Sequence, residues 1–562
     1  MGTLDWIVIA AFFLALIGII ICVVSQKQND SADYFLGGRD ATWIAIGASI
    51  FASNIGSEHL IGLAGAGASS GMAMAHWEIQ GWMILILGWV FVPFYTRSMV
   101  YTMPEFLERR YNPQSRTILS IISLVSYVLT KVAVTVYAGG LVFQQVFGIK
   151  ELWGIDFFWI AAIGLVLLTA LYTIFGGMKS VLYTSVLQTP ILLLGSLVIL
   201  VLGFKELGGW DEMIRICGAV TVNDYGDSMT NLIRSNADPN FPWLGALIGS
   251  SIIGFWYWCT DQFIVQRVLS GKNEKEARRG TIFGAYLKLL PVFLFLIPGM
   301  IAFALHQKYI GDGGFLPMLA NGNPNADAAF PTLVAKLLPA GMKGLVVCGI
   351  LAALMSSLAS LFNSSAMLFT IDFYKRFKPQ TSEKKLVLIG QMATVVIVIL
   401  GILWIPIMRS VGDVLYTYLQ DVQSVLAPGI AAAFLLGICW KRTSSQGGMW
   451  GLLSGMIIGL TRLGAKVYYS NVTDASDSIF KYLFYDMNWL FFCGWMFLFC
   501  MIVVILVSLS TEAPSAEKIQ GLVFGTSTPE QKAATRASWD HWDIIHSVII
   551  LGITAAFYWY FW

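Results

Sequence analysis

FASNIGSEHLIGL, residues 51–63, decides the class of this protein, because it places Ser, Asn, Gly, Glu and His inside an otherwise apolar segment. That segment, residues 43–68, is long enough to cross a bilayer, and lipid does not tolerate so many unsatisfied polar groups. The polar run is typical of a helix broken near the membrane midplane, where backbone carbonyls hold a cation and side chains hold a polar solute. The alternative is an unbroken helix that packs through its small residues.

The overall composition agrees with a membrane location. Of the 562 residues, 57% are hydrophobic and only 12% are charged, which is too apolar for a soluble protein. The net charge of +2 and the absence of a long Lys/Arg run exclude the usual electrostatic signature of nucleic-acid binding. We therefore expect a polytopic membrane protein that contacts lipid and has neither a nucleic-acid partner nor an obligate protein partner.

Long apolar runs predict about fourteen transmembrane helices, the first within residues 4–25 and the last within residues 543–562. Loops rich in Lys and Arg fall on one predicted side, at residues 109–116, 267–279, 375–385 and 441–442. Loops on the other side contain Asp, Asn, Gly and Pro instead, at residues 206–241, 306–330 and 466–480. The positive-inside rule then predicts a cytoplasmic (plasma) membrane protein with both termini outside.

The chain divides into four predicted parts. These are a leading transmembrane helix, a first repeat with its following extracellular loop, a second repeat, and additional C-terminal helices, at residues 1–30, 31–240, 241–440 and 441–562. The strings SNIGSEH and GFWYWCTDQ interrupt apolar spans at corresponding places in the two repeats, which is typical of an inverted-repeat transporter. We expect the polar linker 509–542 to be flexible or briefly helical.

Charged and amide side chains inside apolar spans are the first candidates for solute binding. They are Glu78, Lys131, Lys288, Gln420 and Gln423, with Asp261 at the end of its span. Glu78 and Lys288 can neutralise each other and, with Asn54, His59 and Gln420, would form a neutral site rich in donors and acceptors. Such a site suits a polyol or sugar. The alternative is a structural ion pair that joins two helices.

Three consecutive aromatic residues form a second candidate feature. Trp256, Tyr257 and Trp258 point in three directions around a helix, so they cannot all pack against one neighbour. At least one is expected to line a cavity, either stacked on a sugar ring or acting as a lid. The alternative is an aromatic belt at the membrane interface.

A serine-rich stretch in a later apolar span is a candidate cation site. Ser356 and Ser360 lie on one helix face, and Ser357 follows Ser356 directly. Hydroxyl oxygens opposite the carbonyls of a broken helix suit a hard cation such as sodium. The alternative is close helix packing through small residues.

Several long strings resemble the sodium/glucose cotransporter branch of the sodium/solute symporter family, over about residues 30–510. They are GASIFASNIGSEHLIGLAGAGASSG, TMPEFLERRY, LYTIFGGMKSVLYT, YWCTDQFIVQRVLS, AYLKLLP, LMSSLASLFNSSAMLFTIDFY and IAAAFLLGICWKR. The resemblance implies an all-α membrane protein with a leucine-transporter-like five-plus-five inverted repeat. It also implies alternating access to a central sugar site.

The resemblance assigns expected site residues. Solute-binding positions carry over to Asn54, His59, Glu78, Lys288 and Gln420, with Tyr257 and Trp258 as gate or stacking residues. Sodium ligands carry over to the carbonyls of Ala52, Ile55 and Ala353 and the hydroxyls of Ser356 and Ser357.

This chain departs from the family pattern at the second sodium site. It has Ser185 and Ala359 where relatives with a second sodium site carry aspartate and threonine. These two departures predict one sodium per sugar.

The predicted function is a sodium-coupled symporter that imports a hexose of the glucose or galactose class by alternating access, and not an enzyme. The closest alternative is a symporter of the same fold for myo-inositol, an amino sugar or another small solute such as sialic acid or proline. A membrane sensor or membrane-embedded enzyme would need a signalling domain or a nucleophile with its base, and the linker 509–542 supplies neither.

Overall fold

The protein is described from a computed structural model. The structure describes residues 1–26, 30–56, 58–319, 322–409, 415–470, 472 and 478–562. Within this part of the chain, ten helical stretches are long and apolar enough to cross a membrane, and Trp43–Asn54 is a shorter apolar helix. The described sheet is a single hairpin of β1 (Glu151–Leu152) and β2 (Ile155–Asp156). The prediction of an all-α polytopic membrane protein is confirmed.

The helices fall into three consecutive groups, in which η marks 3-10 and π-helical segments. The leading helix and first repeat comprise α1 (Thr3–Val24), α2 (Ser31–Leu36), η1 (Gly37–Arg39), α3 (Trp43–Asn54), η2 (Glu58–Leu63), α4 (Ala64–Ser70), η3 (Gly71–Met74), α5 (Ala75–Glu78), α6 (Gly81–Ile86), η4 (Leu87–Phe91), α7 (Val92–Ser98), α8 (Met103–Arg110), α9 (Pro113–Ser126), η5 (Tyr127–Val132), α10 (Ala133–Phe147), α11 (Phe157–Leu207) and α12 (Trp210–Gly218).

The second repeat comprises α13 (Trp243–Gly254), η6 (Phe255–Thr260), α14 (Gln262–Leu269), α15 (Glu274–Lys288), η7 (Val292–Leu296), α16 (Ile297–Lys308), η8 (Ile310–Asp312), η9 (Ala326–Ala328), α17 (Ala329–Leu337), α18 (Met342–Met367), η10 (Leu368–Tyr374), α19 (Lys375–Phe377), α20 (Glu383–Arg409) and α21 (Leu415–Cys439). The C-terminal group comprises α22 (Ser445–Ser470), α23 (Ile479–Lys481), η11 (Tyr482–Asp486), α24 (Trp489–Ser510), α25 (Ala516–Ile519), α26 (Pro529–Ala537) and α27 (His541–Tyr560).

The first predicted helix break is present. Helix α3 ends at Asn54, and Ile55 is extended with φ −83° and ψ 103°. Helical structure resumes at Glu58 as the π-helical η2. A helix that stops inside the protein leaves the carbonyls of its last turn without intrahelical donors, so the break supplies backbone oxygens beside the polar side chains.

The second predicted break lies at the matching place in the second repeat. The π-helical η6 ends at Thr260, and Asp261 is extended with φ −76° and ψ 127°. The Asp261 carboxylate accepts a hydrogen bond from the backbone N–H of Phe263 and so caps α14. The sequence rule that paired polar interruptions mark paired helix breaks therefore holds for this chain.

The apolar runs at about residues 156–175 and 181–203 predict two helices, and these are the two segments of α11, which meet at a kink. The chain turns within α11 at Gly177, whose φ is +52°. A Cβ at this position would lie 2.4 Å from the Tyr34 carbonyl oxygen, so glycine is required both by the backbone conformation and by the close approach of α2.

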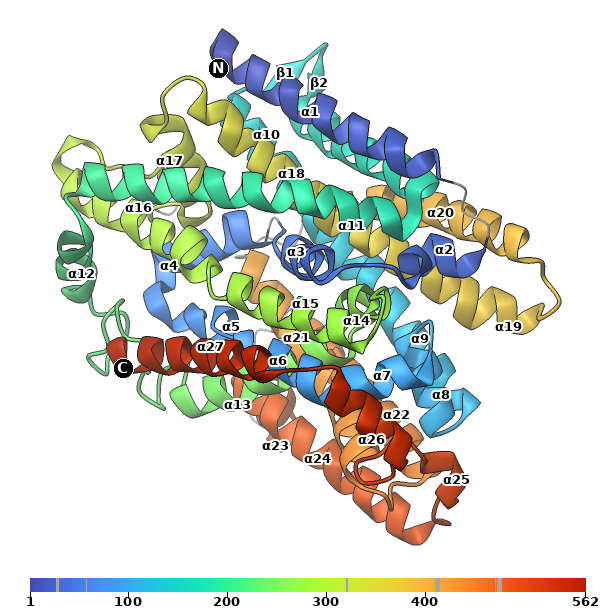
Figure 1. The fold of residues 1–562 in the computed structure, drawn as a ribbon. Coiled ribbons are helices and arrows are strands. Elements are labelled where there is room, and N and C mark those ends of the chain that lie inside the picture. Colours follow the sequence, from blue (N-terminus) through green and yellow to red (C-terminus); the bar gives the residue numbers. More distant parts are fainter. Residues whose placement is uncertain (27–29, 57, 320–321, 410–414, 471, 473–477) are drawn as a thin grey trace.

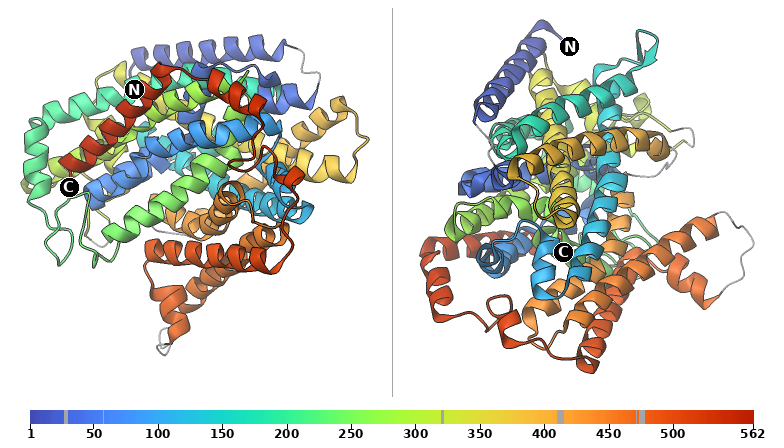
Figure 2. Two further views of the ribbon diagram at one scale, coloured as in Figure 1. Left: turned by 60° about the horizontal axis from the view of Figure 1, so that its bottom comes forward. Right: turned by 90° about the vertical axis from the view of Figure 1, so that its right-hand side faces the viewer.

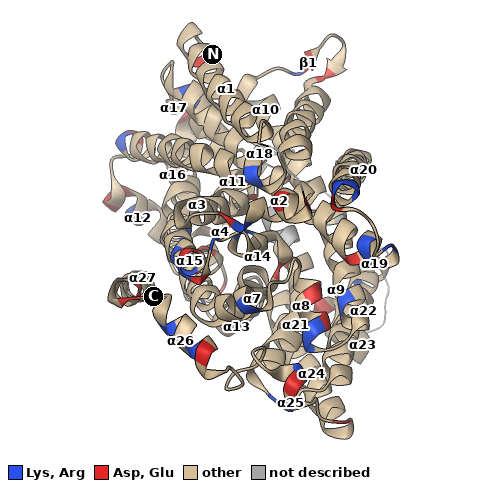
Figure 3. Cartoon of the chain, turned by 45° about the vertical axis from the view of Figure 1, so that its right-hand side comes forward, with Lys and Arg blue, Asp and Glu red and all other residues tan. Residues whose placement is uncertain are grey.

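Helix α3 is at the centre of the bundle, where it contacts α11, α15 and α18. Figure 1 shows α12 and both chain ends toward the left of the molecule, and α19 and α25 toward the right. The two termini therefore lie on the same side of the bundle, and the prediction that this side is extracellular stays a prediction. Figure 3 shows most of the helical body free of coloured charged residues, as expected for helices surrounded by lipid.

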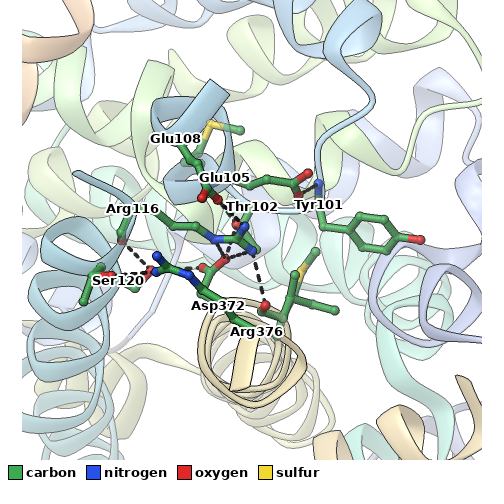
Figure 4. Close-up of polar contacts among 12 residues, drawn as sticks. Tyr101, Thr102, Glu105, Glu108, Arg116, Ser120, Asp372 and Arg376 are labelled. Atoms are coloured by element: carbon green, nitrogen blue, oxygen red, sulfur yellow. Dashed lines mark hydrogen bonds and ion pairs between the residues drawn. The ribbon is translucent and has the colours of Figure 1, made fainter. Parts of the chain in front are cut away.

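A buried polar network joins the two repeats at the end of the bundle that carries α19 (Figure 4). Arg116 of α9 lies 2.6 Å from the Asp372 carboxylate of η10, whose side chain is fully buried. The Thr102 hydroxyl donates to the same carboxylate over 2.8 Å, and Ser120 donates to it over 3.1 Å. Asp372 therefore has several donors, as a buried charge requires.

The C-terminal linker lies against the bundle and contains two short helices, α25 and α26. Figure 2 shows it passing along the outside of the molecule between α24 and α27. Arg97 at the end of α7 donates to the Ser527 hydroxyl over 2.8 Å, and Arg279 of α15 lies 2.7 Å from Asp540. The expectation of a briefly helical segment is confirmed, and the structure adds that it is attached to the first and second repeats.

Candidate functional site

One cavity lies between the two broken helices, and all seven predicted solute-binding residues line it. These are Asn54, His59, Glu78, Tyr257, Trp258, Lys288 and Gln420. They come from α3, η2, α5, η6, α15 and α21, so elements of both repeats meet at this place. Residues separated by more than 360 positions in the chain share one wall only because the two breaks lie side by side.

A chain of buried polar contacts runs along one wall of the cavity. The Lys288 ammonium donates to Glu78 Oε2 over 2.6 Å, and both side chains are at most 4% exposed. The other carboxylate oxygen of Glu78 lies 3.4 Å from His59 Nε2, and Asn54 Nδ2 lies 3.4 Å from the same nitrogen. The predicted neutral pair is present, and its polar atoms can exchange hydrogen bonds with a solute.

The three consecutive aromatic residues point in different directions, as predicted, and two of them line the cavity. Tyr257 and Trp258 line the cavity with their rings perpendicular and 4.9 Å apart, whereas Trp256 is buried beside Lys131. The Trp258 indole N–H donates to Gln80 Oε1 over 3.2 Å. Lys288 Nζ lies 5.3 Å from the Trp258 ring centroid, so this ring is held by both an amide and a cation.

A second buried ion pair lies beside the cavity at the break of the second repeat. Lys131 Nζ of η5 donates to Asp261 Oδ2 over 2.7 Å, and Tyr127 donates its phenolic proton to the other carboxylate oxygen. The same ammonium lies 4.8 Å from the ring centroids of Tyr257 and Phe263. Lys131 therefore joins η5 of the first repeat to the helix break between η6 and α14 in the second.

Further residues line the cavity, among which Lys131 and Gln423 were general candidates for solute binding and Ser357 was an expected sodium ligand. They are Glu58, Trp77, Gln80, Lys131, Val134, Thr135, Ile253, Gly254, Phe263, Ser357, Leu361 and Gln423. The polar character of Glu58, Lys131 and Gln423 inside apolar spans was visible in the sequence. Gln80 gave a comparable signal, as an amide inside an apolar stretch, whereas Thr135 gave none, because only the packing of the helices brings it to the cavity.

The expected sodium ligands lie where α3 ends against α18. Ala52 is in the last turn of α3 and Ile55 follows its end, while Ala353, Ser356 and Ser357 are buried along α18. The Ser53 and Ser360 hydroxyls are 2.6 Å apart and hold the two helices together. Carbonyl and hydroxyl oxygens are the ligands that a hard monovalent cation prefers, so the residues present fit sodium.

The two positions that depart from the family pattern are also beside this region. Ser185 Oγ lies 3.4 Å from Ser356 Oγ and 3.4 Å from Ser49 Oγ, and it donates to the Val181 carbonyl over 2.6 Å. Ala359 is buried and has no hydroxyl. Within the described residues, no group of three His, Cys, Asp or Glu side chains suits a transition metal.

Comparison with known proteins identifies the family. Residues 34–455 match the model of the sodium:solute symporter family. The sodium/myo-inositol cotransporter 2 of Homo sapiens is 37% identical over 539 residues, which cover 93% of this chain and 79% of that protein. The sodium/myo-inositol cotransporter of Canis lupus familiaris is 36% identical over 552 residues, covering 93% and 75% of the two chains.

A solved structure shows the same fold. A Na⁺-coupled sialic acid symporter in a substrate-bound outward-open state has a TM-score of 0.73 at 22% sequence identity, covering 92% of this chain and 99% of that chain. The match of the family model to most of the chain and the extent of both cotransporter alignments agree with this fold. This chain therefore belongs to the sodium:solute symporter family, and it is a multi-pass membrane transporter with sodium as its coupling ion, not an enzyme.

Proposed function

We propose that this chain imports myo-inositol, or a closely similar neutral polyhydroxylated ring, by symport with one sodium ion. The observation that carries the proposal is the neutral Glu78–Lys288 pair, 2.6 Å apart, in a cavity that also contains His59, Asn54 and Gln420. The similarity to sodium/myo-inositol cotransporters supports the cyclitol alternative better than the hexose that the sequence analysis favoured.

The solute would replace the water around these polar groups. Ring hydroxyls both donate and accept, so they match a wall that offers a carboxylate, an ammonium, an imidazole and two amides. Tyr257 would act as the gate, and Trp258 would stack the face of its aromatic ring on the C–H surface of the solute. Each of these contacts is unsuited to a fatty solute.

Sodium would couple to the solute through the first helix break. A cation held by the carbonyls of Ala52, Ile55 and Ala353 and the hydroxyls of Ser356 and Ser357 would fix α3 against α18. The conformation with α3 fixed in this way positions Asn54 and His59 for the solute. The coupling is the higher solute affinity of that conformation, and by linkage the solute raises sodium affinity by the same factor.

Uptake into proteoliposomes with and without an inward sodium gradient tests this function. We expect labelled myo-inositol to accumulate only with the gradient, and glucose, galactose, sialic acid and proline to compete more weakly than unlabelled myo-inositol. Stronger competition by glucose or galactose than by unlabelled myo-inositol would show that the preferred solute is a hexose. Accumulation that does not depend on sodium would overturn the coupling.

A further inference from the structure

The polar groups of the cavity are not equally satisfied. Lys288 has Glu78 as its carboxylate partner at 2.6 Å, and Lys131 has Asp261 at 2.7 Å. Both cavity lysines are thus neutralised by other residues. A third carboxylate, Glu58, lines the same cavity and makes no lysine or arginine ion pair within the described residues.

Glu58 also has hydrogen-bonding capacity left over. Its Oε1 is 4.0 Å from His59 Nδ1, beyond hydrogen-bond distance, and its buried Oε2 has no hydrogen-bond donor in the described part of the chain. The side chain is 14% exposed, so little solvent reaches it. The buried Oε1 of Gln420, across the same cavity, has no donor among the described residues either. Both atoms are acceptors, so this part of the cavity requires donors from the solute.

The backbone at the first break makes room for this carboxylate. A Cβ at Gly56 would lie 2.3 Å from Glu58 Oε2 and 2.8 Å from Glu58 Cδ. The Glu58 side chain therefore folds over Gly56. A larger residue at position 56 would displace it. The same glycine belongs to the break that opens the helix, so the break and the placement of the carboxylate depend on one small residue.

We infer that Glu58 is a specificity-determining residue of the solute site, where it accepts hydrogen bonds from two neighbouring hydroxyls and excludes solutes that carry a carboxylate. This inference rests on the proposed function and deepens it. The two oxygens of a carboxylate can accept two parallel hydrogen bonds, which suits a vicinal diol. A solute carboxylate only accepts hydrogen bonds, so it cannot satisfy the acceptor oxygens of Glu58 and Gln420, whereas a hydroxyl or amine on a ring can donate to them.

The test is competition against sodium-driven uptake of labelled myo-inositol by a matched set of glucose, glucuronate and glucosamine. These probes share one ring and differ in charge. We expect the unmodified chain to bind glucuronate at least tenfold more weakly than glucose. In Glu58→Gln, which keeps the shape and replaces one acceptor oxygen with an N–H donor, the glucuronate-to-glucose ratio of inhibition constants should fall at least tenfold. The conservative Glu105→Gln, on the remote α8, should leave the ratio unchanged.

A ratio within twofold of the unmodified value in Glu58→Gln would overturn the inference, even if all three probes bind more weakly. Gly56→Ala should also change the ratio, because it displaces the Glu58 carboxyl group without changing that group chemically. If Glu58→Gln does not transport, displacement of labelled myo-inositol from the detergent-purified variant gives the same ratio. Absence of sodium-driven uptake of any neutral polyol by the unmodified chain would instead contradict the proposed function itself.

Discussion

The roles of single buried residues in this protein depend mainly on whether another residue neutralises their charge. Glu78 and Lys288 are buried at bilayer depth, where an isolated charge is very costly. Removing either residue would take away the oppositely charged partner of the other, so loss of transport in such variants would not separate solute binding from stability. Gln420 is a better probe, because it is neutral and its Oε1 has no donor in the described part of the chain.

Gln420→Ala is expected to weaken solute affinity by roughly tenfold, equivalent to about 1.4 kcal/mol, because the solute loses one hydrogen-bonding partner. Affinity can be measured by binding of labelled solute to the purified protein. Gln391→Ala is the control, since Gln391 lies on α20 and its amide donates to the Ile174 carbonyl outside the cavity. Affinity within twofold of the unmodified value would show that Gln420 is not a solute ligand.

Asp327, outside the membrane-spanning segments, is expected to make stability depend on pH. Burial raises its pKa from 3.8 to about 6, and its Oδ1 has no donor among the described residues. Because the folded-state pKa is raised, the folded protein is penalised once this carboxyl ionises. The penalty begins to build above pH 3.8, the unfolded value, and is complete above about pH 6.

Asp327→Asn should therefore stabilise the protein at pH 7.5, by up to about 3 kcal/mol, and have little effect at pH 4. Thermal unfolding in detergent at the two pH values measures the difference. Asp312→Asn, at an exposed position in the same loop, should change stability at neither pH. An equal effect of Asp327→Asn at both values would contradict the titration of this group.

At the scale of elements, the two broken helices act as a pair because specific contacts hold each break. Ser53 and Ser360 join the first break to α18, and Lys131 and Asp261 join the second break to η5. Asp261 has two roles, since it neutralises Lys131 and also caps α14. The contact between Lys131 and Asp261 is therefore expected to fix the position of the second break relative to η5.

Lys131→Met should destabilise the protein by about 3 kcal/mol or more, because it leaves the buried Asp261 carboxylate without its cation. Adding Asp261→Asn, which keeps an α14 capping group, should restore part of that loss. The thermal midpoint of each purified variant measures both effects. Lys272→Met, in an exposed pair with Asp40, should change little. A double variant less stable than Lys131→Met alone would contradict a paired role.

At the scale of the whole molecule, the number of sodium ions carried with each solute sets how strongly the sodium gradient drives transport. A second sodium would need a charge near Ser185 to offset a dehydrated cation, and this region contains hydroxyls instead. We therefore expect a coupling ratio of about one sodium per solute, measured from the zero-flux potential in proteoliposomes.

Ser357→Ala should abolish the sodium dependence of uptake, whereas Ser185→Ala should leave it in place. A ratio near two would reveal a second site.

The C-terminal linker connects α24 and α27 while it contacts the first repeat through Arg97. This guanidinium donates to Ser527, Gln531 and Thr535 of the linker. Arg97→Ala should release the segment, so that trypsin cleaves at the exposed Lys532 and Arg536 at least about fivefold faster. Arg215→Ala, in an exposed pair on α12, is the control. Unchanged cleavage would show that the linker is held mainly by its other contacts.

The sequence by itself determined the features that depend on local composition. Length and apolarity predict membrane helices because lipid admits few other structures. The polar interruptions at Asn54 to His59 and near Asp261 predict both helix breaks, since such residues cannot face lipid. The neutral pairing of Glu78 with Lys288 was also predictable, because an isolated charge at that depth is too costly to keep.

Tertiary structure decided what depends on the relative position of distant elements. Lys131 was visible as a buried cation, but only the packing of η5 against η6 identifies Asp261 as its partner. The two predicted helices around Gly177 join without a loop because that glycine adopts a positive φ beneath Tyr34. The cavity that Glu58 shares with Gln420 likewise arises from long-range packing, which no local pattern in the sequence encodes.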